Sequence, residues 1–226
     1  MQCYLLSVKD LTEELTEFHK NFPNGALYRQ SLAKLDECRR QKIERLRAPG
    51  AVSQSIGAGL LLQLAWQRRF QVDERVLGVS QLLSMLGDTE EIPYVVKENG
   101  KPDFDQEKLS APFHFNLSHS GEYVCLVTAD REIGVDIQQL RPMKNYRIAE
   151  RFFRSEELDV LYSCSNDREK EVCFYQLWTR KEAYAKLTGE GIPQAISANV
   201  LQNDRSVRFT PITVPEGYLA ECCYFE

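Results

Sequence analysis

The sequence contains only three histidines, and none of its seven cysteines forms a CxxC pair. His114 and His119 lie five residues apart in an extended-looking segment, where an odd spacing points two side chains to opposite faces. Zinc sites need converging Cys and His ligands, so a zinc site is not expected. Any metal here should be a hard cation held by oxygen ligands.

Long apolar runs are also missing. No stretch is long enough to span a membrane, and residues 1–10 lack the basic and apolar regions of a signal peptide. We therefore expect neither a membrane span nor a membrane partner. The odd number of cysteines, without paired spacing, favours a reducing compartment and predicts a cytoplasmic location.

An excess of positive charge is absent as well. The formal net charge of -5 argues against general nucleic-acid binding, although a local basic face is compatible with it. With 226 residues, of which 43% are hydrophobic, the chain can bury the core of one large domain or two small ones.

The first half of the sequence mixes strand and helix patterns. Apolar spacing predicts a strand over residues 2–8, helices over 11–22, 28–47, 53–70 and 76–86, and a strand over 93–96. The helix over 53–70 should be largely buried, although Gly57 and Gly59 weaken the prediction of its start. A turn is predicted at Glu98-Asn99-Gly100.

The second half begins with three strand-like runs, 113–117, 123–128 and 133–137, which predict an antiparallel meander. Helices over 144–153, 155–162 and 167–187 follow, the last closing on Gly189, and strands over 207–210 and 217–224 end the chain. This order lacks strict strand-helix alternation, which favours an α+β architecture in two packed lobes, 1–108 and 109–226.

The segment Trp178-Thr179-Arg180-Lys181-Glu182-Ala183-Tyr184-Ala185-Lys186 carries the strongest chemical pattern. In a helix, Trp178, Glu182 and Lys186 recur every fourth residue and share one face. Such a face can hold a metal and a phosphate. Taken alone, the segment is more often a packed tryptophan beside an ordinary Glu-Lys pair, since structural ion pairs are common.

Three further features accompany this segment. Asp136 interrupts the apolar strand Ile133-Gly134-Val135-Asp136-Ile137, so it needs a cation, a metal or a hydrogen-bonded partner, unless it only caps the next turn. The run Asn116-Leu117-Ser118-His119-Ser120-Gly121 resembles a polar elbow that could bind an anion. Lys101 follows the predicted turn, where a lysine is usually just solvated.

Taken in order, these motifs resemble those of the 4'-phosphopantetheinyl transferases of the surfactin (Sfp) type. The resemblance covers Gly100-Lys101-Pro102, Phe115 to Gly121, Gly134-Val135-Asp136-Ile137 and Trp178-x-x-Lys181-Glu182-Ala183-x-x-Lys186. It implies a pseudo-twofold pair of similar α+β lobes in one monomer, with antiparallel sheets and flanking helices. It also implies that coenzyme A binds in a cleft between the lobes.

The resemblance implies a reaction and a role for each matched residue. A serine of an apo carrier protein attacks the β-phosphate of coenzyme A, and adenosine 3',5'-bisphosphate leaves. Asp136 and Glu182 would hold Mg²⁺, with Mn²⁺ possible, while Glu182 also orients or deprotonates the serine and Lys186 stabilises phosphate charge. The residues implied to bind coenzyme A are Arg39, Lys42, Lys101, Pro102, Ser118 and His119, with Arg40 or Arg45 as substitutes in the divergent amino-terminal lobe.

One position departs from the family pattern. Many members carry a second acid two residues after the aspartate, where this chain has Gln138. An amide oxygen can coordinate Mg²⁺ but brings no charge. We therefore expect Gln138 to be at most an auxiliary ligand, which puts the affinity for the metal in doubt rather than the reaction.

A basic stripe is predicted on the helix over 144–153. Lys144, Arg147, Arg151 and Arg154 recur at intervals of three and four residues and would share one helix face. A solvated face is the simplest interpretation. Because carrier proteins of this type are acidic, the stripe is a candidate docking surface for one. A non-catalytic coenzyme A or nucleotide sensor on the same fold remains an alternative to the transferase.

Overall fold

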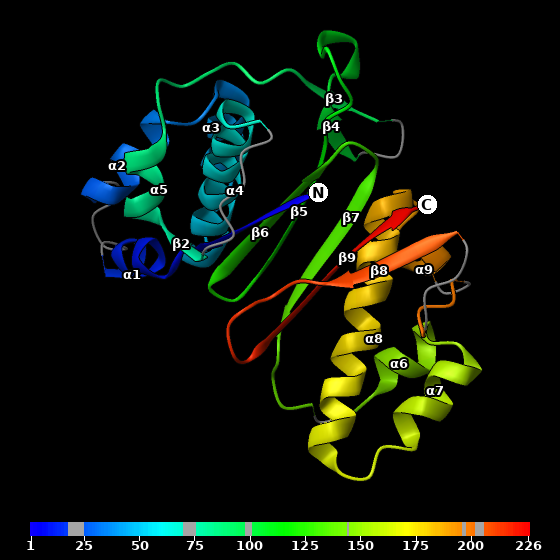
Figure 1. The fold of residues 1–226 in the computed structure, drawn as a ribbon. Helices are drawn as coiled ribbons and strands as arrows, with labels where there is room; N and C mark the ends of the chain where they lie inside the picture. Colours follow the sequence, from blue (N-terminus) through cyan, green and yellow to red (C-terminus); the bar gives the residue numbers. More distant parts are fainter. Residues whose placement is uncertain (18–24, 70–75, 98–100, 144, 196–197, 202–205) are drawn as a thin grey trace. The chain divides into compact units, whose positions relative to one another are not determined.

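The computed structural model describes residues 1–17, 25–69, 76–97, 101–143, 145–195, 198–201 and 206–226 (Figure 1). They form two compact units that interleave in the sequence. The first combines Met1–Tyr94 with Leu117–Thr128, and the second combines Val95–Asn116 with Ala129–Glu226. The lobes 1–108 and 109–226, and their pseudo-twofold relation, stay predictions.

The predicted α+β class is confirmed, because helices accompany sheets whose pairings are mainly antiparallel. β1 (Gln2–Ser7) pairs antiparallel with β6 (Tyr123–Ala129), and β9 (Tyr218–Phe225) pairs antiparallel with both β7 (Ile133–Gln139) and β8 (Val207–Pro211). In the described part of the chain, no helix is both long and apolar enough to cross a membrane.

The first unit is built around helix α4 (Pro49–Gln67), which is buried along most of its length. Among the described residues of the unit, four helices contact α4: α1 (Lys9–Glu17), α2 (Ala26–Ala33), α3 (Glu37–Glu44) and α5 (Val79–Met85). The two glycines of α4 permit close packing: a Cβ at Gly57 would lie 2.7 Å from Val8, and one at Gly59 would lie 2.6 Å from Leu35.

Two helix predictions in this unit were wrong in detail. The helix predicted over 28–47 is interrupted around Asp36, whose carboxylate caps α3 by accepting from the amide of Arg39. The helix predicted over 76–86 begins only at Val79, since β2 (Val76–Gly78) instead pairs in parallel with β1. Of the helix predicted over 11–22, the structure describes the part up to Glu17, which starts earlier, at Lys9, and residues 18–22 lie outside the described residues.

The predicted three-stranded meander was also wrong. β6 lies between β1 and β5 (His114–Ser120) in a sheet of order β2-β1-β6-β5, whereas β7 lies in a sheet of order β7-β9-β8. The partner of β7 is thus a strand from the end of the chain, a pairing that no local pattern reveals. A further pair joins β3 (Tyr94–Val96) and β4 (Pro102–Phe104), and the turn predicted at Glu98-Asn99-Gly100 between them lies outside the described residues.

The second unit packs the long helix α8 (Asp167–Thr188) against β7 and β9, with α7 (Ser155–Tyr162) beside it (Figure 1). Asn166 caps its start by accepting from the amide of Glu169. Gly189 ends it in the left-handed conformation, with φ of 73°, as predicted from its position. The remaining helical elements of the second unit are η1 (Gln106–Lys108), α6 (Arg147–Phe152) and α9 (Ile192–Ala195).

The contact between β7 and α8 is closest at Gly134. A Cβ at this position would lie 2.0 Å from the carbonyl oxygen of Ala183 and 2.6 Å from the amide nitrogen of Leu187. Both neighbours are backbone atoms, so no side-chain rotation could make room. Because strand side chains alternate, Gly134, Asp136 and Gln138 share the face of β7 that meets α8.

We expect Gly134→Ala to lower the free energy of unfolding by about 3 kcal/mol, because the methyl group overpacks the β7–α8 contact. Chemical denaturation measures this change. Gly50→Ala is the matched control, since a Cβ there meets nothing within 4 Å and alanine should stabilise the helix by about 0.5 to 1 kcal/mol. Equal stability of the two variants would contradict the described contact.

Candidate active site

Asp136 lies at the centre of the candidate site, on the face of β7 that meets α8. Its side chain is only 3% exposed, and its Oδ1 accepts an ion-paired hydrogen bond from Nζ of Lys186 at 2.6 Å. Its Oδ2 accepts from Nε2 of Gln138 at 2.8 Å. A buried carboxylate needs such partners because desolvation of an unpaired charge is costly. The expectation that Asp136 has a polar or charged partner is confirmed.

The face of α8 predicted to be functional combines packing with charge. Trp178 stacks on Phe174, with ring centroids 6.2 Å apart, and meets Phe152 edge-on at 6.0 Å. These rings belong to the hydrophobic core beneath α8. One and two turns further on, the same face carries Glu182 and then Lys186. The packed tryptophan and the charged face are therefore parts of one arrangement, not alternatives.

Glu182 is half-buried, and its environment favours the protonated form. Burial raises the pKa of the Glu182 carboxyl, and the negative charge of Asp136 raises it further, while Lys186 partly offsets both. Two carboxylates thus repel each other across the β7–α8 contact. A cation placed between such acids would relieve the repulsion.

The donor set fits a hard divalent cation. Asp136 and Glu182 supply carboxylate oxygens, and Gln138 supplies an amide that at present donates to Asp136. Among the described residues, no group of three or more His, Cys, Asp and Glu side chains could hold a metal ion. Two acids, one amide and added water agree with the coordination habits of Mg²⁺, which keeps several waters in protein sites.

A buried ion pair, which the sequence does not predict, lies on another side of α8. Nζ of Lys181 lies 2.9 Å from Oε2 of Glu157, and both side chains are fully buried. Lys181 also donates to the carbonyl of Ala198, at 3.2 Å, and Glu157 accepts from the amide of Val200, at 3.3 Å. The pair therefore ties α7, α8 and the segment before β8 together, next to Glu182. Lys181 is recognisable in the motif, but Glu157 carries no signal in the sequence.

Lys101 lies against the backbone of the second unit. Its ammonium donates to the carbonyls of Ile133 and Leu187, each at 3.2 Å. Burial lowers the pKa of the Lys101 ammonium. Its neighbour Pro102 begins β4. The Lys101 side chain is half-buried rather than simply solvated, and its predicted role in binding coenzyme A stays a prediction.

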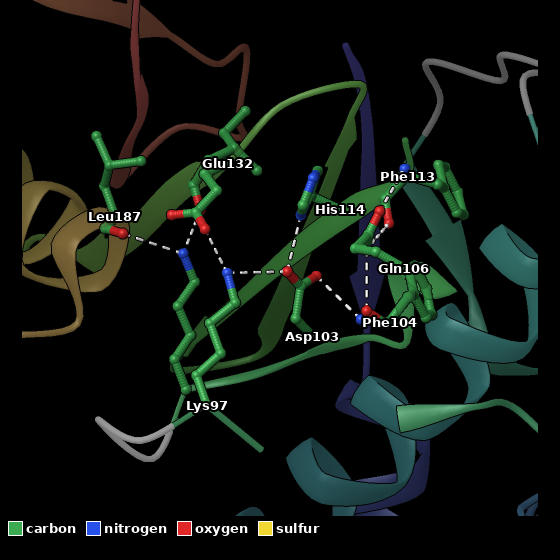
Figure 2. A network of polar contacts seen from close by, with 10 residues as sticks. Lys97, Asp103, Phe104, Gln106, Phe113, His114, Glu132 and Leu187 are labelled. Carbon is green, nitrogen blue, oxygen red and sulfur yellow. Dashed lines mark hydrogen bonds and ion pairs between the residues drawn. The ribbon is translucent and has the colours of Figure 1, made fainter. Parts of the chain in front are cut away.

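A polar network surrounds the β3–β4 pair (Figure 2). The buried carboxylate of Asp103 accepts from Lys97, at 3.1 Å, and lies 2.7 Å from Nδ1 of His114. Lys97 also pairs with Glu132. Burial alone would raise the pKa of Asp103, but hydrogen bonds and charge from His114 and Lys97 lower it overall. No sequence motif suggested this network, because its members come from four separate segments.

The predicted polar elbow is instead part of a strand. Residues His114–Ser120 all belong to β5, and the chain turns only at Gly121, with φ of 55°, and Glu122. Ser118 is buried and His119 is exposed, as expected for neighbours on a strand. Asn116 accepts a hydrogen bond at 3.0 Å from the amide of Val135, and so ties β5 to β7 within the second unit.

Arg39 and Lys42 lie on α3 in the first unit. The Arg39 side chain packs over Gly59 of α4, where a Cβ would lie 2.9 Å from its Cγ. Partial burial lowers the pKa of Lys42, and the neighbouring Arg39 charge lowers it further. An anion bound beside Lys42 and Arg39 would stabilise the charged form of Lys42. Ser118 and His119 belong to this same unit.

The basic stripe is only partly as predicted. Arg147 and Arg151 are exposed on α6 (Arg147–Phe152), but Arg154 lies beyond the end of that helix, where it precedes α7 and pairs with Glu156. The prediction that one helix carries the stripe was wrong, because the chain becomes extended at Phe153. Lys144 lies outside the described residues.

A comparison with protein families matches residues 132–224, which include Asp136, Gln138, Glu182 and Lys186, to the model of the 4'-phosphopantetheinyl transferase superfamily. The match covers 93 of the 226 residues of the chain. The resemblance found in the motifs is thereby confirmed over the β7–α8 region. Arg39, Lys42, Lys101, Ser118 and His119 lie outside the matched residues.

Curated relatives agree with the superfamily match. The chain is 42% identical over 109 residues to the 4'-phosphopantetheinyl transferase psf-1 of Bacillus pumilus, which covers 48% of this chain and 45% of psf-1. It is 36% identical over 129 residues to HetI of Nostoc sp., covering 56% of this chain and 54% of HetI. It is 34% identical over 105 residues to Sfp of Bacillus subtilis, covering 46% and 45%. The chain spans about half the length of the curated relatives it matches.

We expect Lys181→Met to lower the free energy of unfolding by about 3 kcal/mol, because it leaves the Glu157 charge buried without its partner. Adding Glu157→Leu should recover part of this loss, so that a double-mutant cycle in urea shows a cost smaller than the sum of the single changes. Lys108→Met is the control, since that lysine is 67% exposed and its pair with Asp105 contributes at most about 1 kcal/mol. Additive costs would contradict a coupled buried pair.

Proposed function

We propose that the chain transfers the 4'-phosphopantetheine group of coenzyme A to a serine of an apo carrier protein. The serine oxygen forms a bond to the β-phosphorus of coenzyme A, and the bond from that phosphorus to the bridging oxygen breaks. Adenosine 3',5'-bisphosphate leaves, and the serine proton passes to a base or to solvent. The observation that carries the proposal is the Asp136, Glu182 and Lys186 arrangement inside the superfamily match.

Asp136 and Glu182 would hold Mg²⁺, or Mn²⁺, with Gln138 as an auxiliary neutral donor. When bound, the cation would neutralise and orient the pyrophosphate of coenzyme A. The mutual repulsion of Asp136 and Glu182 supports this assignment, because a cation bound between two close carboxylates would relieve it. Gln138 now donates to Asp136, which fixes the carboxylate orientation.

Glu182 and Lys186 are the proposed catalytic residues. The raised pKa of Glu182 makes its carboxylate a stronger base, suited to orient or accept the serine proton. Lys186, one helical turn on, would stabilise charge on the transferring and departing phosphates. It is now paired with Asp136, so its ammonium neutralises one of the two acids until substrate phosphates provide another partner.

The residues proposed to bind coenzyme A come from the motif resemblance. The paired cations Arg39 and Lys42, with His119, suit the 3'-phosphate, and Ser118 and Pro102 would contact the nucleotide. The motif resemblance also implies that Lys101 contacts the nucleotide end of coenzyme A. We further propose that the protein acts as a cytoplasmic monomer on an acidic carrier protein, without nucleic-acid or membrane partners.

The decisive test incubates the chain with coenzyme A, Mg²⁺ and an apo carrier protein and follows intact mass. The carrier should gain one phosphopantetheine group, and chelation of Mg²⁺ with EDTA should stop the reaction. No gain with several carriers, despite measurable coenzyme A binding, would reject the transferase and support a coenzyme A sensor.

We expect Asp136→Ala and Glu182→Gln each to lower kcat by about 10² or more, because each removes charge at the reacting phosphates. Gln138→Ala should cost only about tenfold, as expected for a residue that orients a ligand. Gln138→Glu should lower the Mg²⁺ concentration needed for half-maximal rate. Loss of activity in Gln138→Ala as complete as in Asp136→Ala would show that Gln138 is an essential ligand.

Arg147 and Arg151 are the described part of the proposed carrier docking surface, which also includes Lys144 and Arg154. We expect Arg147→Glu with Arg151→Glu to raise KM for an acidic carrier about tenfold at low salt, with KM for coenzyme A unchanged, because rim charges act mainly on encounter. Arg208→Glu, on β8, is the control for a simple change in net charge. An equal effect of the control would remove α6 as the docking element.

A further inference from the structure

Lys101 makes two hydrogen bonds that lie beside the candidate active site. Its ammonium donates to the carbonyl of Ile133, the first residue of β7, and to the carbonyl of Leu187, in the last turn of α8. Carbonyls in the last turn of a helix lack intrahelical donors, and a cation is favourable there. The lysine therefore joins the start of the strand that carries Asp136 to the end of the helix that carries Lys186.

The two carbonyls flank the closest approach of β7 and α8. Ile133 precedes Gly134, whose Cα faces backbone atoms of Ala183 and Leu187, and Leu187 directly follows Lys186. Gly134 permits this approach but supplies no bond across it. The Lys101 ammonium supplies bonds to both sides, from a third element, at the point where the two backbones meet.

We propose that Lys101 is a positioning residue, which clamps β7 to α8 and thereby holds Asp136 in register with Lys186 and Glu182. Its consequence for catalysis rests on the proposed function. Two of its three N–H donors are directed at backbone carbonyls of the second unit, and the side chain is half-buried. The lowered pKa of its ammonium agrees with this buried setting. This role differs from the nucleotide contact that the motif resemblance assigns to Lys101.

Lys97 offers a matched comparison on the same hairpin. Its amide donates to the carbonyl of Lys101, at 3.0 Å, so the two lysines lie opposite each other beside the paired strands β3 and β4. The Lys97 ammonium pairs with Glu132 and Asp103, as Figure 2 shows, and these contacts anchor the hairpin beside β7 without reaching α8. Replacing Lys97 removes its contacts to Glu132 and Asp103 but leaves both hydrogen bonds of Lys101 in place, whereas replacing Lys101 removes the link between β7 and α8.

The kinetic test compares Lys101→Met, Lys101→Arg and Lys97→Met in the full chain, with coenzyme A, Mg²⁺ and an apo carrier. A positioning role predicts that Lys101→Met lowers kcat by about tenfold or more, with KM for coenzyme A changed by less than about threefold. Lys101→Arg, which keeps a cation with several donors, should recover part of kcat. Lys97→Met should leave both parameters within about twofold of the original chain.

A raised KM with unchanged kcat in Lys101→Met would overturn the proposal in favour of a nucleotide contact. No change in either parameter would overturn it as well.

A second measurement is independent of activity and covers the case in which a variant is merely unstable. Amide hydrogen exchange in the last turn of α8, up to Gly189, should be faster in Lys101→Met than in the original chain and in Lys97→Met. Unchanged exchange there would overturn the clamp. If the original chain transfers nothing to any carrier, the proposed function fails, while faster exchange in Lys101→Met still supports the clamp.

Discussion

The candidate site depends on one backbone contact, the approach of β7 to α8 at Gly134. The distance from a hypothetical Cβ to the carbonyl of Ala183, 2.0 Å, shows that only a residue without a side chain fits there. Because side chains alternate along a strand and recur every three to four residues along a helix, this contact determines which polar side chains of β7 and α8 meet. Asp136 and Gln138 follow on one side, and Glu182 and Lys186 on the other.

The charges at this contact form two arrangements with different purposes. Asp136, Glu182 and Lys186 combine two acids with one base, so one negative charge is left for a further cation to neutralise. Lys181 and Glu157 are fully buried, balanced and hydrogen-bonded to backbone on both sides. The first arrangement suits exchange of partners with a ligand, while the second keeps α8 in place during such an exchange.

Local chemistry in the sequence predicted much of the fold of the second unit and little of its pairing. Asn166 and Gly189 mark the ends of α8, and Asp136, the single acid in β7, predicts a polar or charged partner. The partner of β7, however, is β9, near the other end of the chain, and the three-stranded meander was wrong for that reason. The hydrogen bonds of Lys101 could not be predicted from the sequence, because they are made to backbone carbonyls, which every residue possesses. Strand β2 was missed because its pairing with β1 overrides weak local preferences, whereas the break at Asp36 depends on a local helix cap that the apolar spacing does not show.

The interleaving of the two units has a consequence for synthesis of the chain. Gln2 lies opposite Thr128 in the β1–β6 pairing, so β1 is synthesised well before the strand that becomes its antiparallel partner. Most of the apolar face of α4 and β1 is complete long before that point. Long-range pairing of this kind slows folding and leaves a strand edge exposed in the meantime. Most residues of the first unit precede Val95, but the unit cannot complete its sheet until residues 117–128 have been synthesised.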